Sequence, residues 1–280
     1  MYSDAAFLKS IQAYPDDDAP RLVYADWLEE QGETQRAEFI RLQIADCDLA
    51  RQHELLSLFG TSWAGELFQH VYSYSFRRGF VEEISVEGRM LLSHADRLFD
   101  DAPLRLVRVI GARAVLDDLL RIPQLRQIHS LHLTGCGIGD EGASLLARCP
   151  MLYHLRTLRL GKNTLSDQAV EALTESPCLG YLQSLALQDN LITDLGAQLL
   201  AGDRSRLKNI NMLDLSENLI GEVGAEALAK SSDLNLNRLD MSNQFKGWSN
   251  GFALVGRPNP IQPPQRRALQ QRFSAAACLF

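Results

Sequence analysis

The chain has 280 residues, of which 46% are hydrophobic and 22% are charged, and its formal net charge is −7. This length suits one large domain or a repeat array with a cap, and the composition is that of an ordinary globular protein. The negative charge argues against a general nucleic-acid binder, because neutralising phosphates supplies most of the affinity of such proteins. The apolar runs are far shorter than the roughly 20 residues of a membrane span.

The five cysteines and the N-terminal residues indicate the cellular compartment of the protein. The cysteines are an odd number and form no CxxC pair, which argues against a disulfide framework and against a structural zinc site. Asp4 stands where a secretory signal would carry basic residues, and no long apolar run follows it. We therefore expect a cytoplasmic protein.

Residues 1–75 predict a small all-helical domain that covers the open end of the array behind it. Apolar residues at helical spacing and helix end signals predict four helices, over Asp4–Tyr14, Asp18–Gly32, Gln35–Ala50 and His53–Phe68. The run Asp16-Asp17-Asp18 suggests a cation site, but the remaining oxygen ligands at loop spacing are missing. A turn followed by a helix cap is the better interpretation of this run.

A nine-residue pattern, Leu-x-x-Leu-x-Leu-x-x-Asn, begins at Leu155, Leu182 and Ile210, and a copy that ends in cysteine begins at Ile128. The starts lie 27, 27 and 28 residues apart. This pattern is the leucine-rich repeat, and a fixed period of this length indicates a solenoid. Weaker copies give about seven strands in all, and they contain Val81, Ile84 and Val86, then Leu104, Val107 and Val109, and finally Leu236, Leu239 and Met241.

The predicted fold is an α/β solenoid over residues 76–245, shaped as a horseshoe. Leucines two apart point to one side of a strand, and a helical stretch follows each strand. We expect a parallel β-sheet on the concave face and helices on the convex face. Asn163, Asn190 and Asn218 are expected to be buried amides that bond to backbone groups of neighbouring turns. Cys136 and Gln244 fill the same position in their repeats.

Residues between the strand leucines are the predicted contact surface on the concave face. The basic ones precede the acidic ones along the stack, which gives a face of two signs that could orient a protein partner. A solvated polar face with unselected charges explains the same pattern, and the sequence does not separate the two. The predicted binding residues are Arg108, His132, Arg159, Lys162, Gln188, Asp189, Asp214, Glu217 and Asp240.

Residues 246–280 predict a proline-rich linker and a C-terminal helix with a tail. Gly256–Pro264 contains four prolines and reads as a stiff linker, and Gln265–Ala275 has helical spacing. The apolar tail Ala276–Phe280 either folds back as a cap or docks on a partner.

No catalytic constellation is found, and we expect neither a cofactor nor a bound metal. His129 and His132 lie three apart on a strand and so face opposite sides. The glycine-rich stretch Gly135–Gly139 could suggest a phosphate cradle, but it occupies the loop of a repeat, which already explains it.

The segments Asp16–Gly32 and Arg36–Gln43 resemble the repeat-companion domain, which accompanies leucine-rich repeats in planctomycete and some myxobacterial proteins. Arg78–Glu82 is also similar to these proteins, and the repeats resemble those of ribonuclease inhibitor. The resemblance implies a bacterial, intracellular, non-enzymatic protein. It does not imply ribonuclease binding, because fold alone does not carry function.

Two functions remain open. The first is an adaptor or regulatory subunit that binds another protein through the concave face, as a monomer or as part of a hetero-complex. The second is a structural, self-associating module whose helical cap or C-terminal tail makes the contacts. Neither nucleic acid nor a membrane is an expected partner.

Overall fold

The computed structural model describes residues 4–66, 70–244, 261–273 and 277–279, and the backbone of 248–249 and 252–253. Contacts divide the chain into two compact units, Met1–Arg108 and Val109–Phe280. The first unit contains the predicted helical cap and also takes in the residues after position 75, so the predicted division at 75/76 stays a prediction. Among the helices described, none combines the length and apolarity that crossing a bilayer requires.

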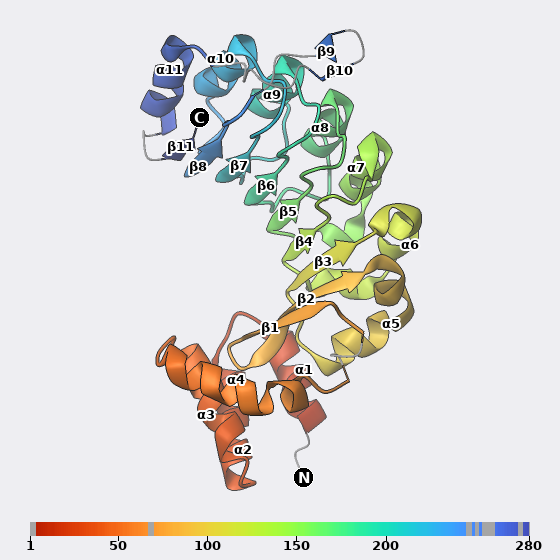
Figure 1. Ribbon diagram of the computed structural model, residues 1–280, viewed down its shortest axis with the longest axis vertical. Helices are drawn as coiled ribbons and strands as arrows, with labels where there is room; N and C mark the ends of the chain where they lie inside the picture. Colours follow the sequence, from red (N-terminus) through yellow and green to blue (C-terminus); the bar gives the residue numbers. More distant parts are fainter. Residues whose placement is uncertain are drawn as a thin grey trace. The chain divides into compact units, whose positions relative to one another are not determined.

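The N-terminal unit joins four helices to a β-hairpin and a fifth helix (Figure 1). Its elements are α1 (Asp4–Ala13), α2 (Ala19–Glu30), α3 (Thr34–Ile44), α4 (Leu49–Ala64), β1 (Ser73–Arg77), β2 (Phe80–Glu87) and α5 (Gly88–Asp101). A buried cluster that includes Ile11, Leu28, Ile40 and Phe80 ties α1, α2 and α3 to β2. The helices are therefore packed on the hairpin.

The predicted helix Gln35–Ala50 is too long at its C-terminal end. Helix α3 ends at Ile44, and α4 begins at Leu49, before the predicted start at His53. Asp48 adopts a left-handed conformation with φ 48°, and its carboxylate accepts a hydrogen bond from the backbone of Arg51 at 3.0 Å. This cap interrupts the apolar periodicity and starts a new helix.

The acidic run before α2 is used in a turn and in ion pairs. The Asp17 carboxylate accepts a hydrogen bond from the backbone N–H of Ala19 at 2.9 Å, which forms the predicted turn. The N-cap residue of α2 is Asp18, and its side chain makes no capping hydrogen bond. Asp16 pairs with Arg105 and Asp18 with Arg78.

The turn between β1 and β2 explains the Arg-Gly-Phe sequence at positions 78–80. Arg78 and Gly79 both have positive φ, 48° and 86°. A Cβ at position 79 would lie 2.4 Å from Cγ1 of Ile40, so only glycine lets the hairpin approach α3 this closely. The side chain of Gln43 accepts the Gly79 N–H at 2.9 Å.

The C-terminal unit repeats a strand and a helix (Figure 1). The short parallel strands are β4 (Ser130–His132), β5 (Thr157–Arg159), β6 (Ser184–Ala186), β7 (Met212–Asp214) and β8 (Arg238–Asp240). Helices α7 (Gly139–Arg148), α8 (Asp167–Thr174), α9 (Asp194–Ala201) and α10 (Glu222–Lys230) pack against one another in chain order. Before them come α6 (Leu116–Leu119) and 3₁₀ turns that include Ala112–Val115 and Pro123–Gln127. Strand β3 (Leu106–Ile110) crosses the boundary between the units.

Register follows the repeat. Leu131, Leu158, Leu185, Leu213 and Leu239 are Cα partners along the sheet, and all are buried. Each leucine column gains about 1.5–3 kcal/mol per side chain from burial that a single repeat could not achieve.

The predicted asparagine position forms a buried ladder of hydrogen bonds. The Asn190 amide donates to the carbonyls of Leu160 and Leu187 at 3.1 and 2.8 Å. Its oxygen accepts the N–H groups of Asn163 and Leu165, both at 3.0 Å. Each asparagine thus joins its own turn to the turn before it, which confirms the predicted role.

The variant residues in this position perform the same task. Gln244 donates to the Leu215 carbonyl at 2.7 Å and accepts the Ile220 N–H at 3.1 Å. The Cys136 thiol lies 3.2 Å from the carbonyl oxygen of Val109. Both substitutions therefore keep the ladder continuous within the unit.

A second ladder, which the sequence did not reveal, joins the helices. Asp167, the first residue of α8, accepts hydrogen bonds from the Thr193 N–H and hydroxyl at 2.8 and 2.6 Å and from the Gly196 N–H at 2.9 Å. Asp140 and Asp194 bond to the following repeat in the same manner. These acids were expected only to favour the positive end of the helix dipole.

The described part of the C-terminus lies at the end of the sheet. Helix α11 (Pro263–Phe273) packs on α10, and β11 (Cys278–Leu279) pairs in parallel with β8. This placement agrees with the capping alternative for the tail. Two short strands, β9 (Trp248–Ser249) and β10 (Phe252–Ala253), form a hairpin before α11. Residues 256–260 of the predicted linker lie outside the described residues. Pro263 and Pro264 were expected to end the linker but begin α11, where their fixed φ suits a helix start.

Candidate protein-binding face

The sheet face is the side of β4–β8 that lies opposite helices α7–α10 (Figure 1). Strand side chains alternate, so the residues on either side of each buried leucine point to this face. Two columns result from the register. The first contains Ser130, Thr157, Ser184, Met212 and Arg238, and the second contains His132, Arg159, Ala186, Asp214 and Asp240.

The second column holds four of the predicted binding residues and brings them into line. Arg159 is exposed, and Ala186 separates it from Asp214. Asp240 is the partner of Asp214 on the next strand, so two carboxylates stand side by side, an arrangement that costs stability unless a cation meets them. Along the second column the sign changes from basic at Arg159 to acidic at Asp214 and Asp240, but Arg238 of the first column adds a basic residue on β8.

His132 differs from the other members of this column. Its side chain is buried, with only 5% of the residue exposed, and a ring nitrogen lies 3.0 Å from the hydroxyl of Ser130. It offers little surface to a partner. The basic half of the second column therefore depends on Arg159.

Asp214 and Asp240 are held in the same way. The Asp214 Oδ1 accepts hydrogen bonds from the N–H and the hydroxyl of Ser216 at 3.0 and 2.7 Å. Asp240 bonds to Ser242 with the same two distances. These bonds fix each carboxylate through one oxygen, which pre-organises it for a cationic partner.

Lys162, Asp189 and Glu217 occupy the loop position just beyond the strands. All three have left-handed backbones, with φ of 59°, 54° and 55°. Lys162 and Asp189 form an ion pair at 3.5 Å across adjacent repeats. These two predicted binding residues thus pair with each other, and each partly neutralises the charge of the other within the protein.

Gln188 covers the adjacent glycine. A Cβ at position 161 would lie 2.4 Å from Cδ of Gln188, so the amide packs directly over the backbone of Gly161. Its buried Oε1 has no hydrogen-bond partner in the described structure. An unpaired buried acceptor is costly, and a donor from a partner would satisfy it.

Arg108 is exposed on β3 and ends the N-terminal unit. Its predicted place in line with the residues of β5–β8 stays a prediction, because the two units are described separately.

Sequence reasoning missed the first column and an aromatic cluster beside it. Met212 is 42% exposed, and Arg238 is also exposed. Tyr153 and Tyr181 are exposed just before β5 and β6, with ring centroids 5.1 Å apart, and His154 packs on the Tyr153 ring. A hydrogen bond with Tyr181 raises the pKa of Tyr153. The 28-residue spacing of the two tyrosines could have revealed this pair.

Among the residues described, no three His, Cys, Asp or Glu side chains cluster in a way that could hold a metal ion. Burial raises the pKa of the thiols of Cys136, Cys149, Cys178 and Cys278, which keeps them protonated and unreactive.

Comparison with known proteins supports the prediction of leucine-rich repeats. A family model described as "Leucine Rich repeat" matches residues 125–147, 154–173, 181–201 and 207–229. No curated protein matches the chain. The chain therefore carries leucine-rich repeats over 125–229, a kind of repeat that generally mediates protein–protein interaction and is typically non-catalytic.

Proposed function

We propose that the protein is a non-catalytic adaptor or regulatory subunit that binds another protein through the sheet face. In this proposal the repeats form a curved solenoid, and the sheet face is its concave side. Residues 1–75 correspond to the repeat-companion domain of a bacterial, cytoplasmic protein. Stacked repeats commonly present such extended surfaces to partners.

One observation carries the proposal, which is the fixed pair of carboxylates at Asp214 and Asp240 in line with exposed Arg159. These side chains contribute nothing to the leucine core or the asparagine ladder. Their like charges are adjacent and unfavourable in the free protein. A partner with a basic group near Asp214 and an acidic group near Arg159 would relieve the repulsion between the two carboxylates and would bind in one orientation.

The experiment reverses the two signs together. Affinity capture from extract of the source organism would be made with the wild type and with Arg159→Glu/Asp214→Arg, which has the same net charge. The captured protein is then purified and titrated directly. We expect the variant to lose the partner and to keep its thermal melt.

A matched control reverses one charge of each sign on the helix side, as Arg148→Glu/Glu171→Arg. Both residues are exposed, on α7 and α8. We expect this control to bind like the wild type. Normal binding by the sheet-face variant would refute the proposal, and light scattering that shows only self-association would favour a structural module.

A further inference from the structure

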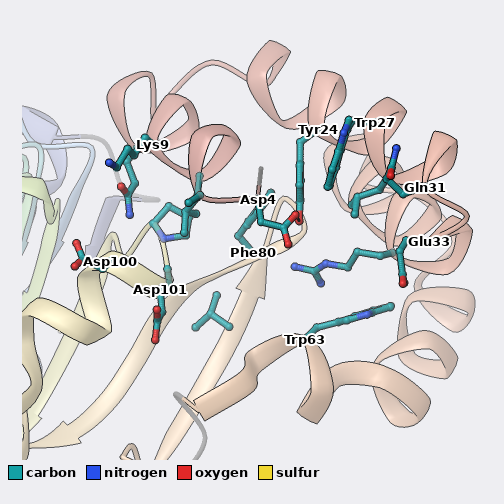
Figure 2. A pocket seen from close by; sticks show the side chains of 18 residues that line it. Asp4, Lys9, Tyr24, Trp27, Gln31, Glu33, Trp63, Phe80, Asp100 and Asp101 are labelled. Carbon is teal, nitrogen blue, oxygen red and sulfur yellow. Dashed lines mark hydrogen bonds between the residues drawn. The ribbon is translucent and has the colours of Figure 1, made fainter. Parts of the chain in front are cut away.

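A cavity of about 940 Å³ lies wholly within the N-terminal unit, away from the repeats. It is lined by residues of α1, α2, α3, α4, β2 and α5, among them Tyr24, Trp27, Trp63 and Phe80 (Figure 2). This volume is that of pockets that hold small organic ligands, which are mostly apolar with a few placed polar groups. Aromatic rings supply the apolar part of this lining, and charged side chains supply the rest.

One end of the cavity holds a cation that lacks a counterion. The Arg36 guanidinium lies 4.7 Å from the ring centroid of Trp63 and 5.5 Å from that of Phe80. Its Nη1 is buried and has no hydrogen-bond partner, and no ion pair joins Arg36 to any residue that the structure describes. Burial lowers its pKa to about 10, so it stays charged at neutral pH.

Two acidic side chains lie at the other end of the cavity. Figure 2 shows Asp100 and Asp101 across the cavity from Glu33 and Trp63. Both acids are exposed in the last turn of α5, where the negative end of the helix dipole disfavours anions. Arg97, one turn earlier, forms its ion pair with Glu66. No ion pair within the described ranges compensates them, although Lys9 also lines this end.

Asp4 and Glu33 are the remaining charged groups that line the cavity. The Asp4 carboxylate accepts a hydrogen bond from the Tyr24 hydroxyl at 3.1 Å. Burial lowers the pKa of Arg36, and the negative charge of Asp4 offsets only part of this effect. The unmet charges at the two ends are thus positive at Arg36 and negative at Asp100 and Asp101.

We propose that this cavity binds a zwitterionic ligand of the short-peptide class, with a carboxylate at Arg36 and an ammonium group at Asp100 and Asp101. Tyr24, Trp27, Trp63 and Phe80 contact its apolar body. A carboxylate would supply the acceptor that the buried Nη1 lacks. An ammonium group would relieve the two acids at the helix end. The ligand is independent of any partner at the sheet face.

Three forms of one tripeptide, alanyl-phenylalanyl-alanine, test the two ends separately. The first has both termini free, the second is amidated, and the third is N-acetylated. Binding to the full chain is followed by calorimetry and by tryptophan fluorescence, since Trp27 and Trp63 line the cavity. Amidation is expected to weaken binding about 10- to 100-fold, because it removes a charged hydrogen-bond partner from a buried cation. Acetylation is expected to weaken it about two- to fivefold at the exposed acids.

Variants assign each effect to its residues. Arg36→Met should bind the free and amidated peptides equally, and Asp100→Asn/Asp101→Asn should bind the free and acetylated peptides equally. Arg41→Met is the control on the same helix, because Arg41 is exposed and pairs with Asp26 and Glu29. It should behave like the wild type.

The proposal fails if no form of the peptide binds up to its solubility limit, or if the three forms bind alike. It also fails if Arg36→Met keeps the preference for a free carboxylate. A melt of each variant shows that it is folded before titration. Loss of sheet-face binding in the same variants is not expected, so the two proposals stand or fall separately.

Discussion

The asparagine ladder of the repeats and the Arg36 cavity of the N-terminal unit both bury polar groups, but they treat them in opposite ways. In the ladder, each amide donates to two carbonyls or more and accepts at least one N–H, as Asn190 does. In the cavity, Nη1 of Arg36 has no partner. Satisfied buried groups hold a fold together, whereas an unsatisfied one marks a place where a ligand would gain binding energy.

The ladder gives the largest expected effect. Asn190→Ala removes the partner of five backbone groups inside the stack, and we expect a loss of about 3–5 kcal/mol in the free energy of unfolding. Urea denaturation measures it. Asn235→Ala, at an exposed position, is the control and should change stability by less than about 0.5 kcal/mol. Similar losses for both would mean that the ladder does not stabilise the stack.

Two arginines with buried guanidinium atoms sharpen the comparison within one unit. Arg21 is 0% exposed and pairs with Glu82 at 2.7 Å. Arg21→Met leaves that carboxylate with Arg78 alone and should cost about 2–4 kcal/mol. Arg36→Met strands no carboxylate and should change stability by less than about 1 kcal/mol, since lost cation–π contact is offset by relief of a buried charge. Thermal melts of the two variants would contradict this if Arg36→Met were the more damaging.

The acids at helix starts and ends supply a third test. Asp167 accepts three hydrogen bonds from the next repeat. Asp167→Asn weakens charge-assisted bonds and should destabilise the protein by about 1–2 kcal/mol in chemical denaturation. An unchanged midpoint would show that the helix ladder is dispensable.

The smallest expected effect has the opposite sign. Asp101→Asn removes an unfavourable charge at the end of α5 and should raise stability by about 0.3–1 kcal/mol at low salt. The gain should shrink as salt is added, because the residue is exposed. A loss of stability at low salt would indicate that Asp101 has a structural role.

The repeats were predictable because their chemistry is periodic. Leu158 and Asn190 recur at a fixed step, so their strands, burial and ladder followed from spacing alone. The bonds from Asp167 to the next repeat were not evident, because first-turn acids in helices have a simpler explanation. The order of signs along the second column could be read from the repeat spacing, but the burial of His132, the pairing of Lys162 with Asp189 and the exposed Arg238 could not.

The helical unit was less predictable. The helices from Asp4 and around Trp27 were expected, but the left-handed cap at Asp48 moved one helix boundary, since asparagine and aspartate adopt this conformation without a clear sequence signal. The Arg36 cavity draws on residues from six elements, and no spacing along the chain brings Trp63 and Asp101 to one site.

The most direct test of function is site-specific photo-crosslinking in extract of the source organism. A photoreactive residue placed at Arg159 or Asp214, on the sheet face, should give a crosslinked partner. The same residue at Arg148 or Glu226, both exposed on helices α7 and α10, should give none. Adducts from the helix positions alone, or none from the sheet face, would contradict the proposed binding surface.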